Sequence, residues 1–159
     1  NNNNNNNWGN NWGNNWGNND WNNNNGNNNN GGNNTGNAGA QTNEVQCESM
    51  TKSGQYTGNT NNPFNGVALY ANNDKVSFSQ YFAYDTHSFT LRGASNNSKT
   101  AKVDLVINGQ TVGTFSFGNN TPTEYTIQNV KHATGQVTVE LVVTNDDGSW
   151  DAYIDYLKF

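Results

Sequence analysis

Residues 103–117 read VDLVINGQTVGTFSF, and this stretch predicts a β-hairpin. Val103, Leu105 and Ile107 occupy every second position, which is the spacing of a strand with one buried face. Asn108 and Gly109 form the pair that two-residue hairpin turns prefer, because both turn positions have a positive φ. We therefore expect antiparallel strands at residues 103–107 and 111–117, joined by a tight turn.

The two-residue period continues on both sides of this hairpin. Apolar residues recur at alternate positions in residues 76–81, 89–91 and 137–143, and a last strand is expected at residues 153–159. No stretch of about ten residues combines helical periodicity with a capping signal, while Gly and Asn interrupt the chain at short intervals. We expect an all-β fold of about eight to ten strands, namely a β-sandwich of the jelly-roll type.

The first 37 residues have a different composition. They contain 24 Asn, 7 Gly, 4 Trp, 1 Thr and a single charged residue, Asp20, so they lack the aliphatic side chains that a core requires. The dipeptide Trp-Gly recurs at residues 8, 12 and 16. We expect residues 1–43 to be a flexible linker. Stacking of the indole rings on polysaccharide and Asn-driven self-association are the alternatives.

Residues 44–159 are predicted to form one domain, and their charges exclude some functions. They carry seven basic and eleven acidic residues and no basic cluster, which argues against nucleic-acid binding. No apolar run approaches the ~18 residues of a membrane span, and the N-terminus has neither the charged nor the apolar region of a signal peptide. We expect a chain that starts inside a longer protein and binds neither nucleic acid nor a membrane.

Three carboxylates lie close together in residues 145–151, which read NDDGSWD. Gly148 permits a sharp turn, so Asp146 and Asp151 are able to converge on one point, and several such oxygens suit a calcium ion. The loop is not an EF-hand, because it lacks the spacing and the final glutamate of that motif. From the spacing alone, a polar turn capped by its own aspartates is the simpler interpretation.

Longer motifs change that interpretation. They are residues 63–70 (PFNGVALY), 79–82 (SQYF), 92–95 (RGAS), 101–107 (AKVDLVI), 132–135 (HATG) and 146–153 (DDGSWDAY). With these motifs, nearly all of residues 45–159 resembles the family 36 carbohydrate-binding modules of bacterial xylanases. The resemblance implies a secreted, monomeric, non-catalytic β-jelly-roll joined to a xylanase upstream.

The resemblance also implies a ligand site for xylan or a xylo-oligosaccharide. One calcium ion is expected to be held by the carboxylates of Asp146 and Asp151 and by the backbone carbonyl of Trp150. Two neighbouring hydroxyl groups of a xylose unit then complete the coordination shell. Tyr56, Tyr70 and the Trp150 ring are expected to line the cleft, because an aromatic ring offers a flat apolar face to a sugar.

A second, structural calcium is implied by the same resemblance, held by acids on the first and last strands. The matching candidates are Glu48 and Asp155, with Gln46 where the family commonly has an acid. An amide oxygen carries no charge, so Gln46 lowers the expected affinity of this site for calcium. Glu44 and the carbonyls near Asp74 are further candidate ligands. The alternative is that these acids are ordinary surface residues of a strand.

Catalysis by this chain is not expected. A glycoside hydrolase needs two carboxyl groups about 5–9.5 Å apart across the scissile bond, one of them protonated, whereas calcium would keep the loop carboxylates ionised. His87 and His132 are interpreted as surface histidines, because no nucleophile motif accompanies them. Cys47 is interpreted as a small buried strand residue. The alternative function is a calcium-stabilised adhesion or structural β-sandwich that binds another glycan or a protein.

Overall fold

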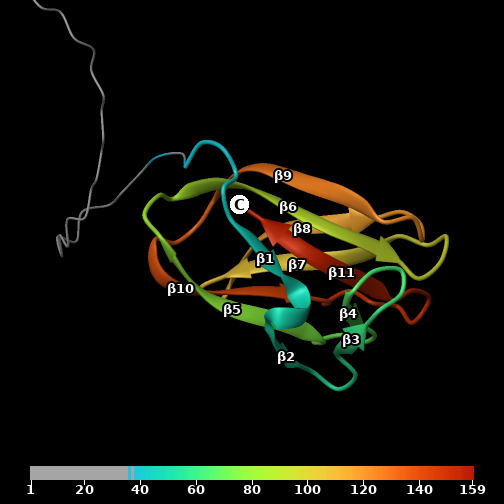
Figure 1. Ribbon diagram of the computed structural model, residues 1–159. Coiled ribbons are helices and arrows are strands. Elements are labelled where there is room, and N and C mark those ends of the chain that lie inside the picture. The colour runs from blue at the N-terminus through green and yellow to red at the C-terminus, as the bar shows by residue number, and fades with distance from the viewer. Residues whose placement is uncertain (1–35, 37) are drawn as a thin grey trace, which may run out of the picture. The chain divides into compact units, whose positions relative to one another are not determined.

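Two antiparallel β-sheets packed face to face make up the structure (Figure 1). The computed structural model describes residues 36 and 38–159, which belong to one compact unit. This part of the chain contains eleven strands and one short 3-10 helix, η1 (Cys47–Ser49). The strands are β1 (Glu44–Gln46), β2 (Thr51–Ser53), β3 (Gly58–Thr60), β4 (Gly66–Leu69), β5 (Lys75–Phe82), β6 (Thr86–Ser95), β7 (Ala101–Ile107), β8 (Gln110–Phe117), β9 (Thr123–Lys131), β10 (Gly135–Val142) and β11 (Ala152–Lys158).

Each sheet mixes strands that are distant in the sequence. The first sheet has the order β3-β4-β11-β6-β9, and β1 pairs with the part of β11 that follows the β4 pairing. The second sheet has the order β2-β5-β10-β7-β8. All strand pairs in both sheets are antiparallel. The all-β sandwich of the jelly-roll class that the sequence predicts is confirmed.

The predicted hairpin is formed by β7 and β8. Ile107 pairs with Gln110 across the turn, as a two-residue loop requires. Asn108 and Gly109 have φ angles of 52° and 79°, so both turn residues are in the left-handed region that this turn type needs. The two strands are slightly longer than predicted, because they begin at Ala101 and Gln110.

The core lies between the two sheets and is built from alternate residues of the long strands. In β7 the buried residues Val103, Leu105 and Ile107 face inward, and β10 shows the same alternation. The largest fully buried side chains are Phe89, Phe115, Phe117, Leu69, Leu91, Leu105, Ile107, Leu141, Ile154 and Leu157. Burial of each such side chain contributes roughly 1.5–3 kcal/mol relative to its exposure to water. This rigid core holds the loops at the ends of the strands.

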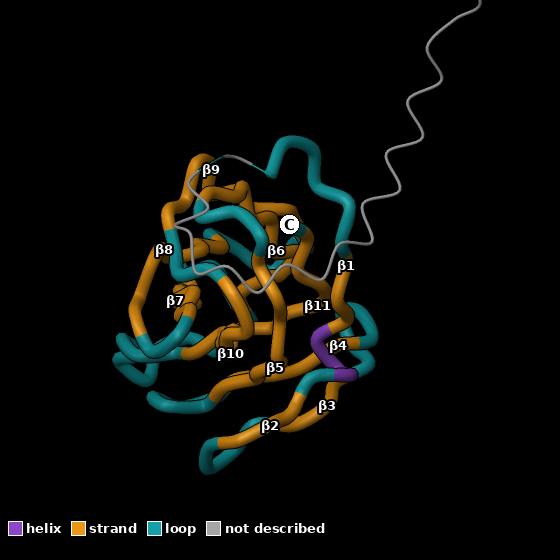
Figure 2. Tube along the Cα trace, turned by 90° about the vertical axis from the view of Figure 1, so that its left-hand side faces the viewer, coloured by secondary structure: helices purple, strands orange, loops and turns teal. Residues whose placement is uncertain are grey.

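Three features differ from the sequence-based expectation. The described chain has eleven strands, because β1, β2 and β3 are each three residues long and show too few residues for a period to be read. β9 was not predicted, since seven of its nine residues are exposed. Cys47 is buried as expected, but it lies in η1 and not in a strand; Figure 2 shows this turn beside β4.

Residues just before β1 also contact the sandwich. The N–H of Thr86 donates to the Gly36 carbonyl and the N–H of Ala38 donates to the Thr86 carbonyl, both at 3.0 Å. The N–H groups of Thr42 and Asn43 donate to the Phe159 carbonyl. Contacts with the domain therefore begin before residue 44, where the sequence analysis placed its boundary. The rest of the predicted linker, with its Trp-Gly repeats, lies outside the described residues. The described residues include no helix with the length and apolar character of a membrane span.

Candidate functional site

The loop between β10 and β11 is shaped by hydrogen bonds among its own residues. The N–H of Gly148 donates to Asp146 Oδ1 at 2.7 Å, and Gly148 has a φ of 80°, where a side chain would be strained. Asp147 Oδ1 accepts the N–H and the hydroxyl of Ser149, at 2.9 and 2.5 Å. These hydrogen bonds from Ser149 lower the pKa of Asp147. The exposed Asp147 is thus engaged in the turn itself.

Asp146 is anchored to the turn between β4 and β5. The N–H of Asp146 donates to Asn72 Oδ1 at 2.7 Å, and Asn72 Nδ2 donates to the Asp146 carbonyl at 3.0 Å. The side-chain amide of Asn72 thus forms a reciprocal pair of hydrogen bonds with the Asp146 backbone, although the two residues are 74 positions apart in the sequence. This pairing fixes the Asp146 backbone and leaves its carboxylate half-buried at the loop surface.

Asp151 is held in the same way by Asn96, which follows β6. Asn96 Nδ2 donates to Asp151 Oδ2 at 2.8 Å, the N–H of Asp151 donates to Asn96 Oδ1 at 2.8 Å, and the N–H of Asn96 donates to the Asp151 carbonyl at 3.0 Å. Burial, and then the neighbouring Asp146 carboxylate, raise the pKa of Asp151. The fold therefore brings the two carboxylates near each other, where they repel.

Trp150 lies between the two halves of this site, and its indole ring belongs to the core. The residue is only 7% exposed and packs among the buried residues of the core. No donor of the described residues is hydrogen-bonded to the Trp150 carbonyl oxygen. The backbone oxygen, more than the ring, is thus what Trp150 presents to a ligand.

These groups set a limit on how a metal ion is held. Within residues 36 and 38–159, no three His, Cys, Asp or Glu side chains gather in an arrangement suited to a metal ion. A cation at the loop would be coordinated by the carboxylates of Asp146 and Asp151 and by the Trp150 carbonyl. Calcium takes six to eight oxygen ligands, so this set fits a calcium ion that keeps several positions for water or for a ligand.

Tyr56 lies between β2 and β3, and Tyr70 directly follows β4. The buried carboxylate of Asp74 is hydrogen-bonded to the backbone of both residues. Asp74 is 0% exposed. Its Oδ1 accepts the N–H of Tyr56 at 3.1 Å, and its Oδ2 accepts the N–H groups of Tyr70 and Ala71 at 3.0 and 3.2 Å. Tyr56 is 56% exposed and Tyr70 is 42% exposed, so neither residue belongs to the core. Both remain available to stack on a sugar.

Tyr153 joins the two groups of residues. The pairing of Tyr153 with Ala68 places Tyr153 close to Tyr70, and Asp151 is two residues before it. Burial, then Tyr70, then Asp151 raise the pKa of the Tyr153 hydroxyl. A pocket of about 250 Å³ opens beside Tyr153 and Asn96. The sequence analysis missed Tyr153, Asn72, Asn96 and Asp74 as site residues. Tyr153 is the last residue of the motif at residues 146–153, but no role was assigned to it. For Asn72, Asn96 and Asp74 the sequence signal was that they follow or precede strands, where amide and carboxylate side chains commonly bond to turns.

Residues 46–159 match the family model described as carbohydrate binding module (family 6). A crystal structure of the CBM36-1 domain of a multidomain xylanase, from the hindgut metagenome of Trinervitermes trinervoides, is 68% identical in sequence with a TM-score of 0.73. That match covers 75% of this chain and 95% of the solved chain. The chain belongs to the family 36 carbohydrate-binding modules.

Two further relatives describe the setting of the module. A family 36 module solved in complex with calcium and xylotriose is 54% identical, with a TM-score of 0.72, and the match covers 73% of this chain and 98% of that one. The bifunctional xylanase/deacetylase of Pseudobutyrivibrio xylanivorans is 66% identical over 119 residues, which are 75% of this chain. The chain spans 20% of the length of that enzyme. Such a module is a binding domain without catalytic function.

The residues that the family resemblance assigned to a second calcium are only partly brought together in the module. The carboxylates of Asp155 and Glu48 both lie near Cys47 and, after burial, help to raise the pKa of its thiol. Glu48 Oε1 accepts Asn65 Nδ2 at 2.7 Å, whereas Glu48 Oε2 is buried without a hydrogen-bond partner. Asp155 is paired with Arg92.

The Gln46 side chain is hydrogen-bonded through its nitrogen, and its amide oxygen has no hydrogen-bond partner among the described residues. Its Nε2 donates to Glu44 Oε1 at 2.7 Å. Among the residues expected at a second metal site, the unpartnered Oε2 of Glu48 is the observation that favours a cation, because a buried carboxylate oxygen without a partner is costly. Gln46 and Glu44 are engaged with each other.

The interpretation of His87 and His132 as surface residues was wrong for this module. Both are only 8% exposed, and His87 Nδ1 lies 2.8 Å from His132 Nε2. His132 Nδ1 lies 2.8 Å from the Ala133 carbonyl, which only accepts, so His132 Nε2 must accept the proton of His87 Nδ1. Burial lowers the pKa of both rings. The pair packs against Phe82, far in sequence from the loop.

Proposed function

We propose that the module binds xylan and xylo-oligosaccharides through a calcium ion held by Asp146, Asp151 and the Trp150 carbonyl. The observation that carries this proposal is the juxtaposition of the two anchored carboxylates with exposed tyrosine rings. Tyr153, two residues after Asp151, pairs with Ala68, two residues before Tyr70, so neighbouring strands carry the carboxylate and the tyrosine. A family 36 module solved with calcium and xylotriose is 54% identical to this chain over 98% of its own length, which supports the same ligand here.

The chemistry of the site suits a neutral sugar. One hydroxyl group competes poorly with water for a cation, but two adjacent hydroxyl groups replace two waters at once. The oxygen ligands that the protein supplies are fewer than calcium requires, so positions remain for such a diol. Tyr56 and Tyr70 then offer apolar faces with a polar tip, which matches a sugar ring that is apolar on its face and polar at its rim.

The decisive experiment compares Asp151→Asn with Asp147→Asn. Both variants remove one negative charge from the same loop, but only Asp151 is proposed to bind the metal. Calorimetric titration with a linear xylo-oligosaccharide should show binding in calcium, none in chelator, at least about tenfold weaker binding for Asp151→Asn, and near-normal binding for Asp147→Asn. Binding that persists in chelator and in Asp151→Asn would instead favour an adhesion or structural sandwich with another ligand.

A second calcium at Glu48 and Asp155 is a separate part of the proposal. It is supported by the buried, unpartnered Oε2 of Glu48. The loop variant Asp151→Asn isolates this site, because any remaining rise of melting temperature on addition of calcium reports a second ion. Glu48→Gln in the same background should abolish that rise. An unchanged rise in the double variant would contradict the assignment.

The xylan-degrading relatives of the module support a proposal about its setting in a longer enzyme. We propose that residues 1–43 connect it to a catalytic domain, that the whole enzyme acts outside the cell on xylan, and that the module works as a monomer. Tethering raises the local concentration of an attached enzyme at the polymer. Removal of the Asn-rich segment from the intact enzyme, compared with removal of the module, would separate the linker's contribution from that of sugar binding.

A further inference from the structure

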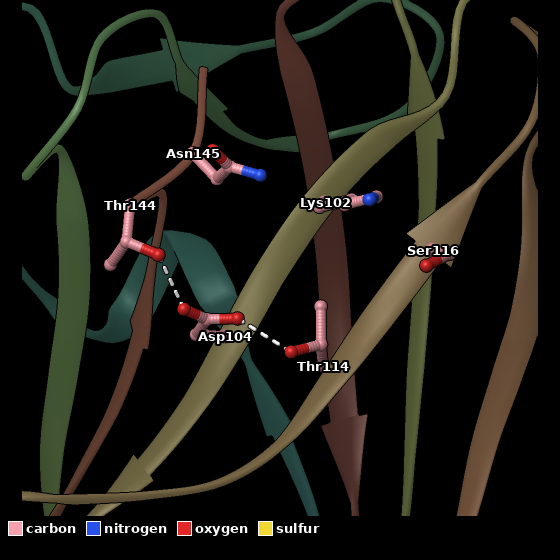
Figure 3. A pocket seen from close by; sticks show the side chains of 6 residues that line it. All are labelled: Lys102, Asp104, Thr114, Ser116, Thr144 and Asn145. Carbon is pink, nitrogen blue, oxygen red and sulfur yellow. Dashed lines mark hydrogen bonds between the residues drawn. The ribbon is translucent and has the colours of Figure 1, made fainter.

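Two adjoining pockets lie on the side of the loop where β7 and β8 pass. One has a volume of about 420 Å³ and is lined by Lys102, Asp104, Thr114, Ser116, Thr144 and Asn145 (Figure 3). The other has a volume of about 270 Å³ and continues along Lys99 to Ser149 and Trp150. Because both pockets are lined by Lys102 and Asn145, they form one depression, called here the Lys102 groove.

The acids of the Lys102 groove are already engaged. Asp104 Oδ1 accepts the hydroxyl of Thr114 at 2.6 Å, and Asp104 Oδ2 accepts the hydroxyl of Thr144; Figure 3 shows Asp104 between these two threonines. Asp147 Oδ1 accepts two hydrogen bonds from Ser149. These hydrogen bonds occupy some of the acceptor positions of the two carboxylates but leave their negative charges in place.

The side-chain ammonium and amide donors that line the groove have no partners among the described residues. The ammonium groups of Lys99 and Lys102 form no ion pair or hydrogen bond with other residues in the described part of the chain, and the same holds for the side chain of Asn145. Lys99 acts on Asp147 only at longer range, as the last contribution that lowers its pKa. Four of the remaining five basic residues form ion pairs, and Lys52 donates to the carbonyls of Glu48 and Met50.

The net negative charge of the domain affects where an anionic ligand is able to bind. Residues 44–159 carry eleven acids against seven basic residues, a difference of −4. An anionic sugar is therefore repelled by most of the surface, whereas in the groove Lys99 and Lys102 balance the charges of Asp104 and Asp147 and offer ammonium groups without an ion-pair partner. The two unpaired lysines gather beside the loop proposed to hold calcium, since their pocket also includes Ser149 and Trp150.

We infer that the Lys102 groove is a subsite for a carboxylate-bearing sugar unit, namely a uronic acid side group on a xylan chain whose backbone is bound at the calcium loop. Lys99 and Lys102 bind the carboxylate, and the Asn145 amide donates to a ring hydroxyl. The inference rests on the proposed xylan-binding function and adds a preference for acidic over neutral xylan. Two exposed charge pairs are each worth little, so the preference is about three- to tenfold.

The test uses two xylo-oligosaccharides with the same backbone, one neutral and one with a single uronic acid side group. Both are titrated calorimetrically into the chain in saturating calcium, at low and high ionic strength. The wild type should bind the acidic ligand about three- to tenfold more tightly at low ionic strength, and high salt should reduce this difference. The double variant Lys99→Met/Lys102→Met should bind both ligands equally and retain wild-type affinity for the neutral one.

Lys131→Met is the matched control for charge. Lys131 is on β9 in the other sheet, its side chain is 80% exposed, and its ion pair with Asp85 is long at 3.8 Å. This variant should keep the preference for the acidic ligand. A preference that survives in the double variant would assign the carboxylate to the calcium ion and overturn the inference. Equal binding of both ligands by the wild type would also overturn it, whereas failure of the neutral ligand to bind would overturn the proposed function itself.

Discussion

The fully buried carboxylate of Asp74 accepts the backbone N–H of Tyr70 at 3.0 Å. Its other oxygen accepts the N–H of Tyr56 at 3.1 Å. One side chain in the interior thus sets the position of two exposed rings that we propose to contact the sugar. Gly54 closes over this carboxylate so tightly that an added Cβ would come within 2.4 Å of Oδ1. Asp74 is therefore a positioning residue.

Asp74→Asn should weaken both the fold and sugar binding. The amide has one acceptor oxygen where the carboxylate has two, so at least one N–H group loses its partner in the interior. The free energy of unfolding in urea should fall by about 1–3 kcal/mol, and calcium-saturated affinity for xylo-oligosaccharide should fall with it. Asp104→Asn is the control, because its partners are hydroxyl groups that can turn to water, and it should change stability by less than about 0.5 kcal/mol. Equal effects of the two substitutions would contradict the role of Asp74.

Asn96→Ala should reduce calcium affinity at the loop. The substitution removes the hydrogen bonds to Asp151 Oδ2 and from the Asp151 N–H while leaving the proposed ligands in place. Residues that orient metal ligands commonly contribute about 10- to 100-fold in affinity. Titration of calcium, read by sugar binding, measures the loss. Asn97→Ala serves for comparison, since Asn97 bonds to the Ser149 carbonyl and not to Asp151; an equally large loss there would attribute the effect to general loosening of the loop.

Acid should destabilise the module through its buried histidine pair. Burial lowers the folded-state pKa of His87 and His132 below the ordinary value of 6.5. The unfolded chain then binds more protons than the folded one below pH 6.5, so stability is present above that pH and is lost as the pH falls toward the folded-state pKa values. When both rings are protonated, two N–H groups face each other and the hydrogen bond between the rings is lost.

Melting temperatures in saturating calcium between neutral pH and pH ~5 measure this effect. His132→Phe keeps an aromatic ring beside Phe82 and removes one titrating group. Its melting temperature should depend less steeply on pH than that of the wild type. The same slope in both proteins would mean that carboxylates, and not the histidine pair, control acid sensitivity.

Gly109→Ala should be costly although there is space for a methyl group. No atom lies within 4 Å of a Cβ built on Gly109, but its φ is 79°, where an L-residue is strained. The expected loss in the free energy of unfolding is about 1 kcal/mol. Gly118→Ala is the matched control, because Gly118 is equally open and does not have a positive φ. A similar loss of stability for the two variants would show that the positive φ of Gly109 does not make its substitution costly.

Much of the fold and part of the site were predictable from local sequence. The hairpin, β5, β7 and β10 were predicted because alternation and turn chemistry act between residues that are close in the chain. The residues of the loop that we propose to hold calcium were named through a motif of eight consecutive residues. β9 escaped prediction, since its residues are mostly exposed and leave no hydrophobic period to detect.

By itself, the sequence determined an all-β sandwich, a hairpin with a two-residue turn at Asn108-Gly109, and a loop rich in carboxylates at residues 145–151. Only the tertiary structure decided which of those carboxylates lie together, because Asn72 and Asn96 reach the loop from turns 74 and 55 positions away. The tertiary structure also brings His87 into hydrogen-bonding contact with His132, and the backbones of Tyr56 and Tyr70 into contact with Asp74. Such contacts depend on strand order across two sheets, and no local pattern records which distant strands become neighbours.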